Sequence, residues 1–146
     1  MRPVPPLLVV FCLSAMAGLA LVSPGPRLLA APWTWLGAAV GVLGLALAVS
    51  GARFFRRLGT NIKTFDDPDL LVTSGLFRLS RNPMYLGFLL LLTGAALLIG
   101  RATPFLPVLV FFLAAQLWYI PFEERALTRR FGADYLAYRG KVRRWI

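Results

Sequence analysis

The sequence contains no histidine, one cysteine and only 6 acidic residues among its 146 positions. Without histidine, the chain lacks the side chain that most often acts as a general base near neutral pH and most often binds metals. The lone cysteine, Cys12, cannot form a disulfide within the chain, and its position inside an apolar run favours a small core residue over a reactive thiolate. With so few ligand side chains, the sequence predicts no metal site.

Positive charge, by contrast, is abundant: 16 lysine and arginine residues give the chain a formal net charge of +10. In a soluble protein this excess would point to nucleic acid. Here the basic residues flank long apolar segments, so we expect anionic membrane lipids as the partner and no nucleic acid.

Hydrophobic residues make up 58% of the chain, more than a soluble domain of this length could bury. They fall into four runs, each close to the roughly 17–25 residues that cross a hydrocarbon core. We therefore predict a single all-α, integral-membrane domain with about four transmembrane helices. The expected spans are residues 6–22, 33–52, 84–100 and 104–122, with a loop at 53–82 and a tail at 123–146.

The breaks between these runs are short. Residues 23–26 read Ser-Pro-Gly-Pro and residues 100–104 read Gly-Arg-Ala-Thr-Pro, so each flanking pair of spans is expected to form an antiparallel hairpin. The first run could instead be a signal peptide, but its long apolar stretch and lack of a cleavage site favour a retained helix. Within the second run, Gly37, Gly41 and Gly44 have the helical spacing of a packing face.

The basic residues predict how the chain is oriented. The loop and the tail hold most of them, whereas the two short links hold only Arg27 and Arg101. The positive-inside rule therefore places the loop, the tail and both termini in the cytosol. The same side would hold all the acidic residues, which are Asp66, Asp67, Asp69, Glu123, Glu124 and Asp134.

The tail has a helical pattern of its own. Large apolar side chains recur there at three- and four-residue steps, at Phe131, Tyr135, Tyr138, Val142 and Trp145. This pattern predicts a cytosolic amphipathic C-terminal helix at the headgroup level. The same segment could equally fold back over the central loop as a lid.

One polar cluster marks the start of the third span. Asn82 suits a helix N-cap and Pro83 suits the first helical turn, so the cluster is explained simply as a helix start. A helix N-terminus also offers free N–H groups and the positive end of the helix dipole. Together with Arg81, this end could bind a carboxylate or a phosphate.

A second cluster follows the fourth span, where Glu123 and Glu124 stand side by side. They could be a solvated first helical turn after Pro121, a position that suits acidic residues. They could also clamp a cationic or hydroxyl-rich ligand, since carboxylates at a membrane boundary tend to be functional. Two antiparallel neighbouring helices would bring this pair close to Arg81 and Asn82.

The second half of the chain, from about Leu70, resembles a known family. Residues 81–87, Arg-Asn-Pro-Met-Tyr-Leu-Gly, are similar to the Arg-His-Pro-x-Tyr-x-Gly signature of the isoprenylcysteine carboxyl methyltransferases and their bacterial relatives. Glu123-Glu124 and residues 131–138 resemble the carboxy-terminal part of that family. Phospholipid methyltransferases have a similar layout. The resemblance implies an S-adenosylmethionine-dependent methyltransferase in the bacterial inner membrane.

The resemblance also implies roles for individual residues. By analogy, the cofactor would contact Leu70, Leu71, Val72, Phe77, Asn82, Pro83, Met84, Tyr85 and Glu123, and the catalytic set would be Arg81, Glu124 and Tyr85. Three positions depart from the family pattern, and the first is Phe77, which stands where the family usually has a tyrosine. Asn82 replaces a histidine, and residues 118–120 lack the arginine that binds substrate in the eukaryotic enzymes. The last departure weakens any transfer of the prenylcysteine substrate to this chain.

The expected reaction is methyl transfer to a small lipophilic acceptor. A carboxylate acceptor needs no base, whereas an amine or thiol acceptor would need one, with Glu124, Tyr85 and Asp69 as the candidates. One alternative is a non-enzymatic membrane accessory protein that keeps the fold. Another is a reductase that uses a nicotinamide cofactor, but the chain has no Gly-x-Gly-x-x-Gly motif and no additional domain for it.

Overall fold

The computed structural model describes residues 4–59 and 69–146, and it confirms the all-α fold. A π-helical turn, η2 (Ala115–Tyr119), separates α4 from α5, and a short 3-10 helix, η1 (Gly75–Arg78), precedes α3. Of the charged loop residues predicted to be cytosolic, Lys63, Asp66 and Asp67 lie outside the described residues. The α-helices are α1 (Pro5–Val22), α2 (Trp35–Arg57), α3 (Pro83–Ile99), α4 (Phe105–Ala114) and α5 (Ile120–Lys141).

Three helical stretches are long and apolar enough to cross a membrane, namely α1, α2 and the continuous stretch from Phe105 to Lys141. The fourth, α3, is shorter but also apolar. Large apolar side chains such as Leu7, Phe11 and Leu45 are exposed on the outer surface of the bundle. So much outward-facing apolar surface suits a lipid environment and would be a liability in water.

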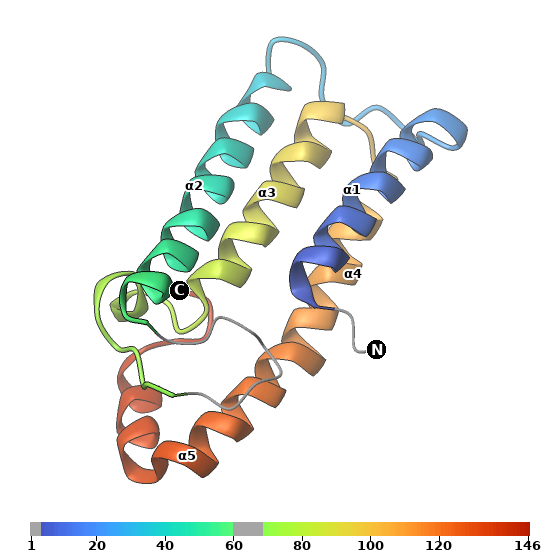
Figure 1. Ribbon diagram of the computed structural model, residues 1–146. Coiled ribbons are helices and arrows are strands. Elements are labelled where there is room, and N and C mark those ends of the chain that lie inside the picture. The colour runs from blue at the N-terminus through green and yellow to red at the C-terminus, as the bar shows by residue number, and fades with distance from the viewer. Residues whose placement is uncertain (1–3, 60–68) are drawn as a thin grey trace.

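The two links between helices lie together at one end of the bundle, which we call the link end (Figure 1). Main-chain hydrogen bonds join them there, from Leu28 N to Gly100 O and from Ala102 N to Pro26 O. The helices do not pair as their order suggested. Helix α2 packs mainly on α3, and α1 packs on α4 and α3. The predicted hairpin of the first two spans is therefore wrong. The link between α1 and α2 crosses the end of α3, which separates the two helices.

Glycines explain why α2 packs so closely on α3. A Cβ atom added at Gly87 would lie 2.6 Å from the main-chain N of Ala48 and 2.7 Å from the carbonyl O of Gly44. A Cβ at Gly37 would overlap the main chain at Leu98 in the same way. The two backbones therefore touch with no side chain between them, as small residues allow in lipid. The packing role predicted for the α2 glycines is confirmed.

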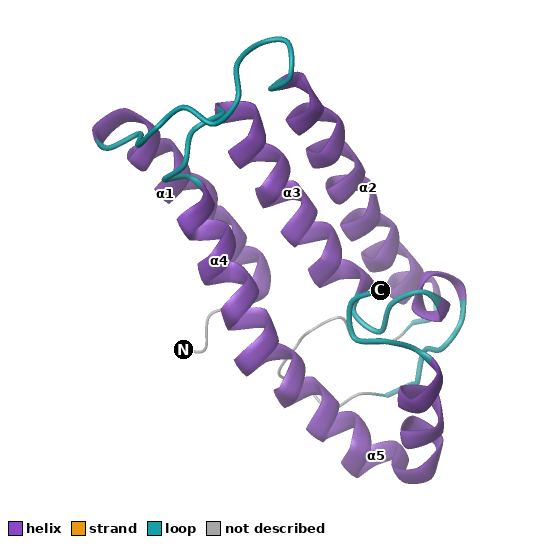
Figure 2. Cartoon of the chain, turned by 180° about the vertical axis from the view of Figure 1, so that it is seen from behind, coloured by secondary structure: helices purple, strands orange, loops and turns teal. Residues whose placement is uncertain are grey.

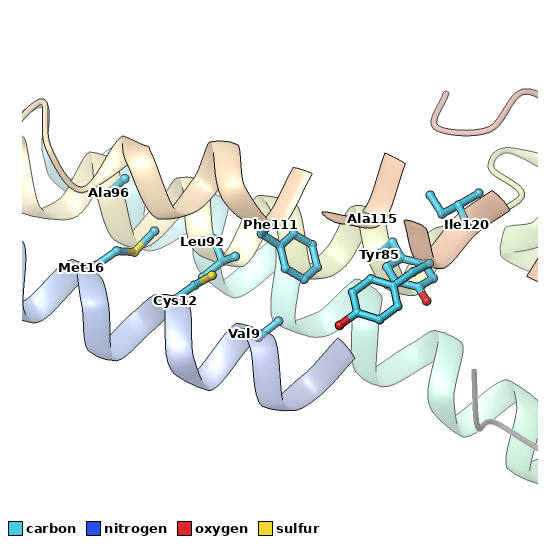
Figure 3. Close-up of a cluster of buried hydrophobic side chains, with 10 residues drawn as sticks. Val9, Cys12, Met16, Tyr85, Leu92, Ala96, Phe111, Ala115 and Ile120 are labelled. Atoms are coloured by element: carbon cyan, nitrogen blue, oxygen red, sulfur yellow. The ribbon is translucent and has the colours of Figure 1, made fainter. Parts of the chain in front are cut away.

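The main apolar core lies between α1, α3 and α4. Figure 3 shows Cys12 and Met16 of α1 facing Leu92 of α3 and Phe111 of α4. Cys12 is 1% exposed among these side chains, which confirms that it is a small core residue. The same core continues to Tyr85, at the end of α3 opposite the links.

The prediction of a separate amphipathic C-terminal helix is wrong. The helix that begins at Phe105 continues through η2 and α5 to Lys141, so the C-terminal helix extends an apolar one. At Gly132 the backbone leaves helical geometry, with φ 50° and ψ −119°, and the chain turns back toward the bundle. Beyond this turn, Tyr135 and Tyr138 pack against Val72 and Phe77 of the central loop rather than facing a membrane surface.

Candidate active site

The start of α3 and the first turn of α5 meet at the end of the bundle opposite the links, which we call the site end (Figure 2). Arg81 precedes α3, and its Nη2 lies 3.0 Å from Oε1 of Glu124 on α5. Both side chains are largely buried, with 9% of Arg81 and 11% of Glu124 exposed. The structure thus joins the two polar clusters that lie more than forty residues apart in the sequence by a direct ion pair.

A second arginine, absent from the predicted site residues, completes this ion pair. Arg144 places Nη2 at 2.7 Å from Oε2 of Glu124 and Nε at 3.1 Å from Oε1. This is the side-on, bidentate geometry in which guanidinium groups bind carboxylates most strongly. Glu124 is therefore buried and engaged through both oxygens, which rules out the solvated helical turn as its description.

Arg81, in contrast, is only partly engaged. Its side chain donates one hydrogen bond, through Nη2, while Nε and Nη1 are buried and have no hydrogen-bond partner among the described residues. A charged donor that is buried without a hydrogen-bond partner costs about 1–3 kcal/mol or more. Such groups are rare in native proteins, and a bound anion would satisfy these two donors.

Next to this ion pair, Tyr85 and Glu123 make a second connection between α3 and α5. The Tyr85 hydroxyl donates a hydrogen bond of 2.8 Å to Oε1 of Glu123. Tyr119 lies beside Tyr85, with the ring centroids 6.2 Å apart and nearly parallel, and Trp118 stacks on Tyr119 at 5.0 Å. A carboxylate bordered by aromatic rings is a favourable environment for a cation.

Asn82 begins α3 as predicted, but its side chain does not cap the helix. Instead, Asn82 Nδ2 and Ser80 Oγ both donate to the main-chain carbonyl of Arg144, at 3.0 and 3.3 Å. The Arg81 N–H donates to the carbonyl of Arg143 at 3.0 Å. Residues 80–82 therefore hold the segment that carries Arg144 against the start of α3.

The other end of that segment is fixed by α4 and the π-helical turn η2. Trp145 Nε1 donates a hydrogen bond of 2.9 Å to Oε1 of Gln116, and its ring lies 5.6 Å from that of Phe112. Sequence reasoning missed Arg144, Trp145 and Gln116. Gln116 carried a signal, because an amide within an apolar span is costly unless it has a partner.

Several residues that the resemblance assigned to the cofactor belong to other contacts than the ion pair. Leu70 is exposed, and Val72 and Phe77 belong to the cluster beneath the tail. The Phe77 carbonyl accepts a hydrogen bond of 2.6 Å from the Tyr138 hydroxyl. Met84 contacts α2 at Gly51, Pro83 is fully buried at the start of α3, and Leu71 packs against the cluster beneath the tail. Asp69, one of the candidate bases, is exposed.

Two tyrosines of the tail are perturbed electrostatically. Burial raises the pKa of Tyr138 to about 12, with a smaller opposing effect from the positive charge of Arg81 and a further rise from Tyr135. Burial, followed by the charge of Glu124, also raises the pKa of Tyr135. Both phenols therefore stay protonated at physiological pH, and that of Tyr138 donates the hydrogen bond to Phe77. The described residues contain no group of acidic, histidine and cysteine side chains that could hold a metal.

Comparison with known proteins connects this geometry to a family. The model of the phospholipid methyltransferase family matches residues 32–134, well over half of the chain. The chain is 40% identical over 63 residues to an uncharacterized protein of Haemophilus influenzae, covering 43% of this chain and 100% of that protein. It is 33% identical over 100 residues to protein-S-isoprenylcysteine O-methyltransferase A of Arabidopsis thaliana, covering 66% of this chain and 48% of the plant enzyme.

The chain thus spans about half the length of the plant enzyme, and the residues that match the family include Arg81 and Glu124. The resemblance to isoprenylcysteine and phospholipid methyltransferases that the two motifs predicted is confirmed. The chain belongs to the phospholipid methyltransferase family.

Proposed function

We propose that this protein is an integral-membrane methyltransferase that transfers a methyl group from S-adenosylmethionine to a small lipophilic acceptor. The observation that carries the proposal is the pairing of Arg81 with Glu124 at 3.0 Å and of Tyr85 with Glu123 at 2.8 Å. These contacts gather both family-like motifs at one end of an apolar bundle. The names of the matched family and of the plant relative support a methyl transfer reaction.

The residues at the site end fit the chemistry of such a donor. S-adenosylmethionine carries a sulfonium, an ammonium and a carboxylate, and supplies an electrophilic methyl group. Glu123, bordered by Tyr85 and Tyr119, suits one of the cationic groups. Arg81 has two buried nitrogens left for an anion, either the carboxylate of the donor or an acidic group of the acceptor.

Methyl transfer from a sulfonium is an in-line displacement, so the protein contributes mainly orientation and exclusion of water. We assign Tyr85 and Glu123 to positioning, because their hydrogen bond ties α3 to α5 at the site. Glu124 was a candidate base, but both its oxygens accept hydrogen bonds from guanidinium groups. We therefore assign Glu124 to holding Arg81 in place. An acceptor carboxylate or other group that needs no deprotonation suits these residues best.

The membrane arrangement is part of the proposal. The exposed apolar faces of α1, α2 and α4 would lie in lipid, and the basic residues of the loop and tail would face the cytosol of a bacterial cell. A polar donor would then reach the site end from the cytosol, while a lipophilic acceptor would approach from the bilayer. With this orientation both termini are cytosolic.

Calorimetry in detergent with S-adenosylhomocysteine, the product of the donor, tests this function. We expect saturable binding that Glu123→Ala weakens at least tenfold, since it removes the carboxylate next to Tyr85. Asp134→Ala, which removes an exposed carboxylate from the same helix, should leave the affinity unchanged. Absence of binding to the wild type would favour the alternative, a non-enzymatic accessory protein. A mass-spectrometric search of membranes for lipids that gain a methyl group would then identify the acceptor.

A further inference from the structure

The ion pair at the site end contains more positive than negative charge. Two guanidinium groups, from Arg81 and Arg144, share the single carboxylate of Glu124. These three side chains carry one more positive than negative charge, and the neighbouring carboxylate of Glu123 accepts a hydrogen bond from Tyr85 instead. A largely buried network of this kind is stabilised when an anion joins it. The hydrogen bonds of the two arginines indicate which of them would bind that anion.

The geometry divides the two arginines by role. Arg144 occupies both carboxylate oxygens, with hydrogen bonds of 2.7 and 3.1 Å. Arg81 reaches only Oε1, which it shares with Arg144, so its Nε and Nη1 remain without a partner among the described residues. Arg81 is also the more deeply buried of the two, with 9% of its side chain exposed against 25% for Arg144. The buried hydrogen-bonding capacity that is left over thus belongs to Arg81.

This division depends on Arg144. If its guanidinium were absent, Oε2 of Glu124 would lose its donor, and Arg81 would be the nearest cation of the network to replace it. An arginine that turns to bind both oxygens of a carboxylate forms the preferred fork. Arg81 would then be neutralised by its own neighbour and would have less to offer a ligand.

We propose that Arg144 is a positioning residue, which occupies Glu124 so that Arg81 stays available to bind an anionic group of a ligand. The group is a carboxylate or phosphate, contributed by the methyl donor or by the acceptor. The inference rests on the proposed function for the identity of these ligands, while the division of roles rests on the hydrogen bonds alone.

The chain holds Arg144 firmly enough for this role. Its main-chain carbonyl accepts hydrogen bonds from Ser80 and Asn82, the two neighbours of Arg81. Its Nη1 lies 3.5 Å from the carbonyl O of Gln116 in the π-helical turn. In that turn Ile120 N bonds to the carbonyl of Ala115, and the next bond in the same register would need an N–H at Pro121, which proline lacks. The Gln116 carbonyl is thus left for Arg144.

Binding of acid and amide pairs of the same molecule tests the proposal on the full chain in detergent. One pair is S-adenosylhomocysteine and its carboxamide, and the other is dodecanoate and dodecanamide. Each pair differs only in the anionic group, so the ratio of the two affinities reports the anion site. The first pair tests the donor as the source of the anion and the second tests a lipophilic acceptor.

We expect the wild type to prefer the acid by about tenfold in at least one pair, which is the effect of one charge-assisted hydrogen bond. Arg144→Gln should lose the preference. Arg144→Lys should keep part of it, because an ammonium cannot engage both carboxylate oxygens as a fork does. Arg139→Gln, the same change at an exposed position of α5, should behave as the wild type.

The double variant Glu124→Gln with Arg144→Gln separates positioning from a merely structural role. It removes the carboxylate that would capture Arg81, so the preference for the acid should return. An Arg144→Gln variant that keeps the preference, or a folded double variant that does not regain it, overturns the proposal, as does a wild type with no preference in either pair. If Arg144→Gln does not fold, Arg144→Lys and the double variant decide. A wild type that binds neither S-adenosylhomocysteine nor its carboxamide contradicts the proposed function, and the dodecanoate pair still tests Arg144.

Discussion

The two ends of the helix bundle both contain arginines, yet the arginines do different things. At the link end, Arg101 Nη1 donates to the carbonyl of Gly25 at 3.2 Å and Arg27 Nε donates to the carbonyl of Leu29 at 3.3 Å. These contacts close loops. At the site end, Arg81 and Arg144 bind the carboxylate of Glu124, and two buried nitrogens of Arg81 have no hydrogen-bond partner among the described residues. A basic residue near a membrane therefore says little about function until its partners are known.

The largest expected difference between the ends comes from removing one arginine at each. Arg81→Gln should weaken the binding of the acid that the site recognises, S-adenosylhomocysteine or dodecanoate, by about 30- to 100-fold, which corresponds to hydrogen bonds with a charged group worth about 2–3 kcal/mol. The fold should survive, because Arg144 still pairs with Glu124 through both oxygens. Arg101→Gln should leave the affinity unchanged. Calorimetry measures both, and equal losses in the two variants would contradict the comparison.

A smaller difference should follow from removing one hydroxyl at each end. Tyr85→Phe breaks the 2.8 Å hydrogen bond to Glu123, and Thr103→Val breaks the 2.6 Å hydrogen bond to the carbonyl of Ser23. We expect Tyr85→Phe to weaken cofactor binding by about tenfold, since one such bond is worth about 1–2 kcal/mol. Thr103→Val should lower only the unfolding temperature. A matching loss of affinity in Thr103→Val would show that the ends are coupled.

The smallest effect concerns high pH. The pKa of Tyr138 is about 12 in the folded protein, above the ordinary value of 10.0. The folded state therefore keeps its proton where the unfolded state loses it, and stability falls as the pH rises from about 10 to about 12. Tyr138→Phe should flatten this fall. Thermal unfolding across the pH range measures it, and hydrogen exchange should show the tail opening before the link end, where residues 23–34 and 100–104 contain no tyrosine.

The sequence predicted the helices well because membrane-spanning segments depend on local hydropathy. It also indicated that Arg81 and Glu124 would lie at one face, since that inference needs only the order and direction of the spans. The pairing of α2 with α3 was less accessible, because the glycines of α2 could be recognised as a packing face while their partner could not. Helix order suggested α1 instead.

The contribution of the tail could not be read from the sequence for a different reason. The three- and four-residue pattern of its apolar residues assumed one uninterrupted helix, but Gly132 turns the chain in the middle of that pattern. Arg144 therefore looked like one of many basic residues explained by membrane orientation. Its role depends on a chain reversal that brings it next to residues more than sixty positions away. Gly132 was the one local hint that the helix would not continue straight.

The π-helical turn at Ala115–Tyr119 has a consequence for the rotational phase of the long helix. Each residue of an α-helix advances the chain by about 100° around its axis, whereas a wide i→i+5 turn takes up one extra residue with a much smaller change of phase. On the two sides of this turn, Phe111 faces the core and Glu124 faces Arg81. Deleting a single residue between 115 and 119 would replace the wide turn with an ordinary one, and it would remove the hydrogen-bond register that leaves the Gln116 carbonyl for Arg144. Length polymorphism in this one turn would therefore be far less tolerable than in either of the links.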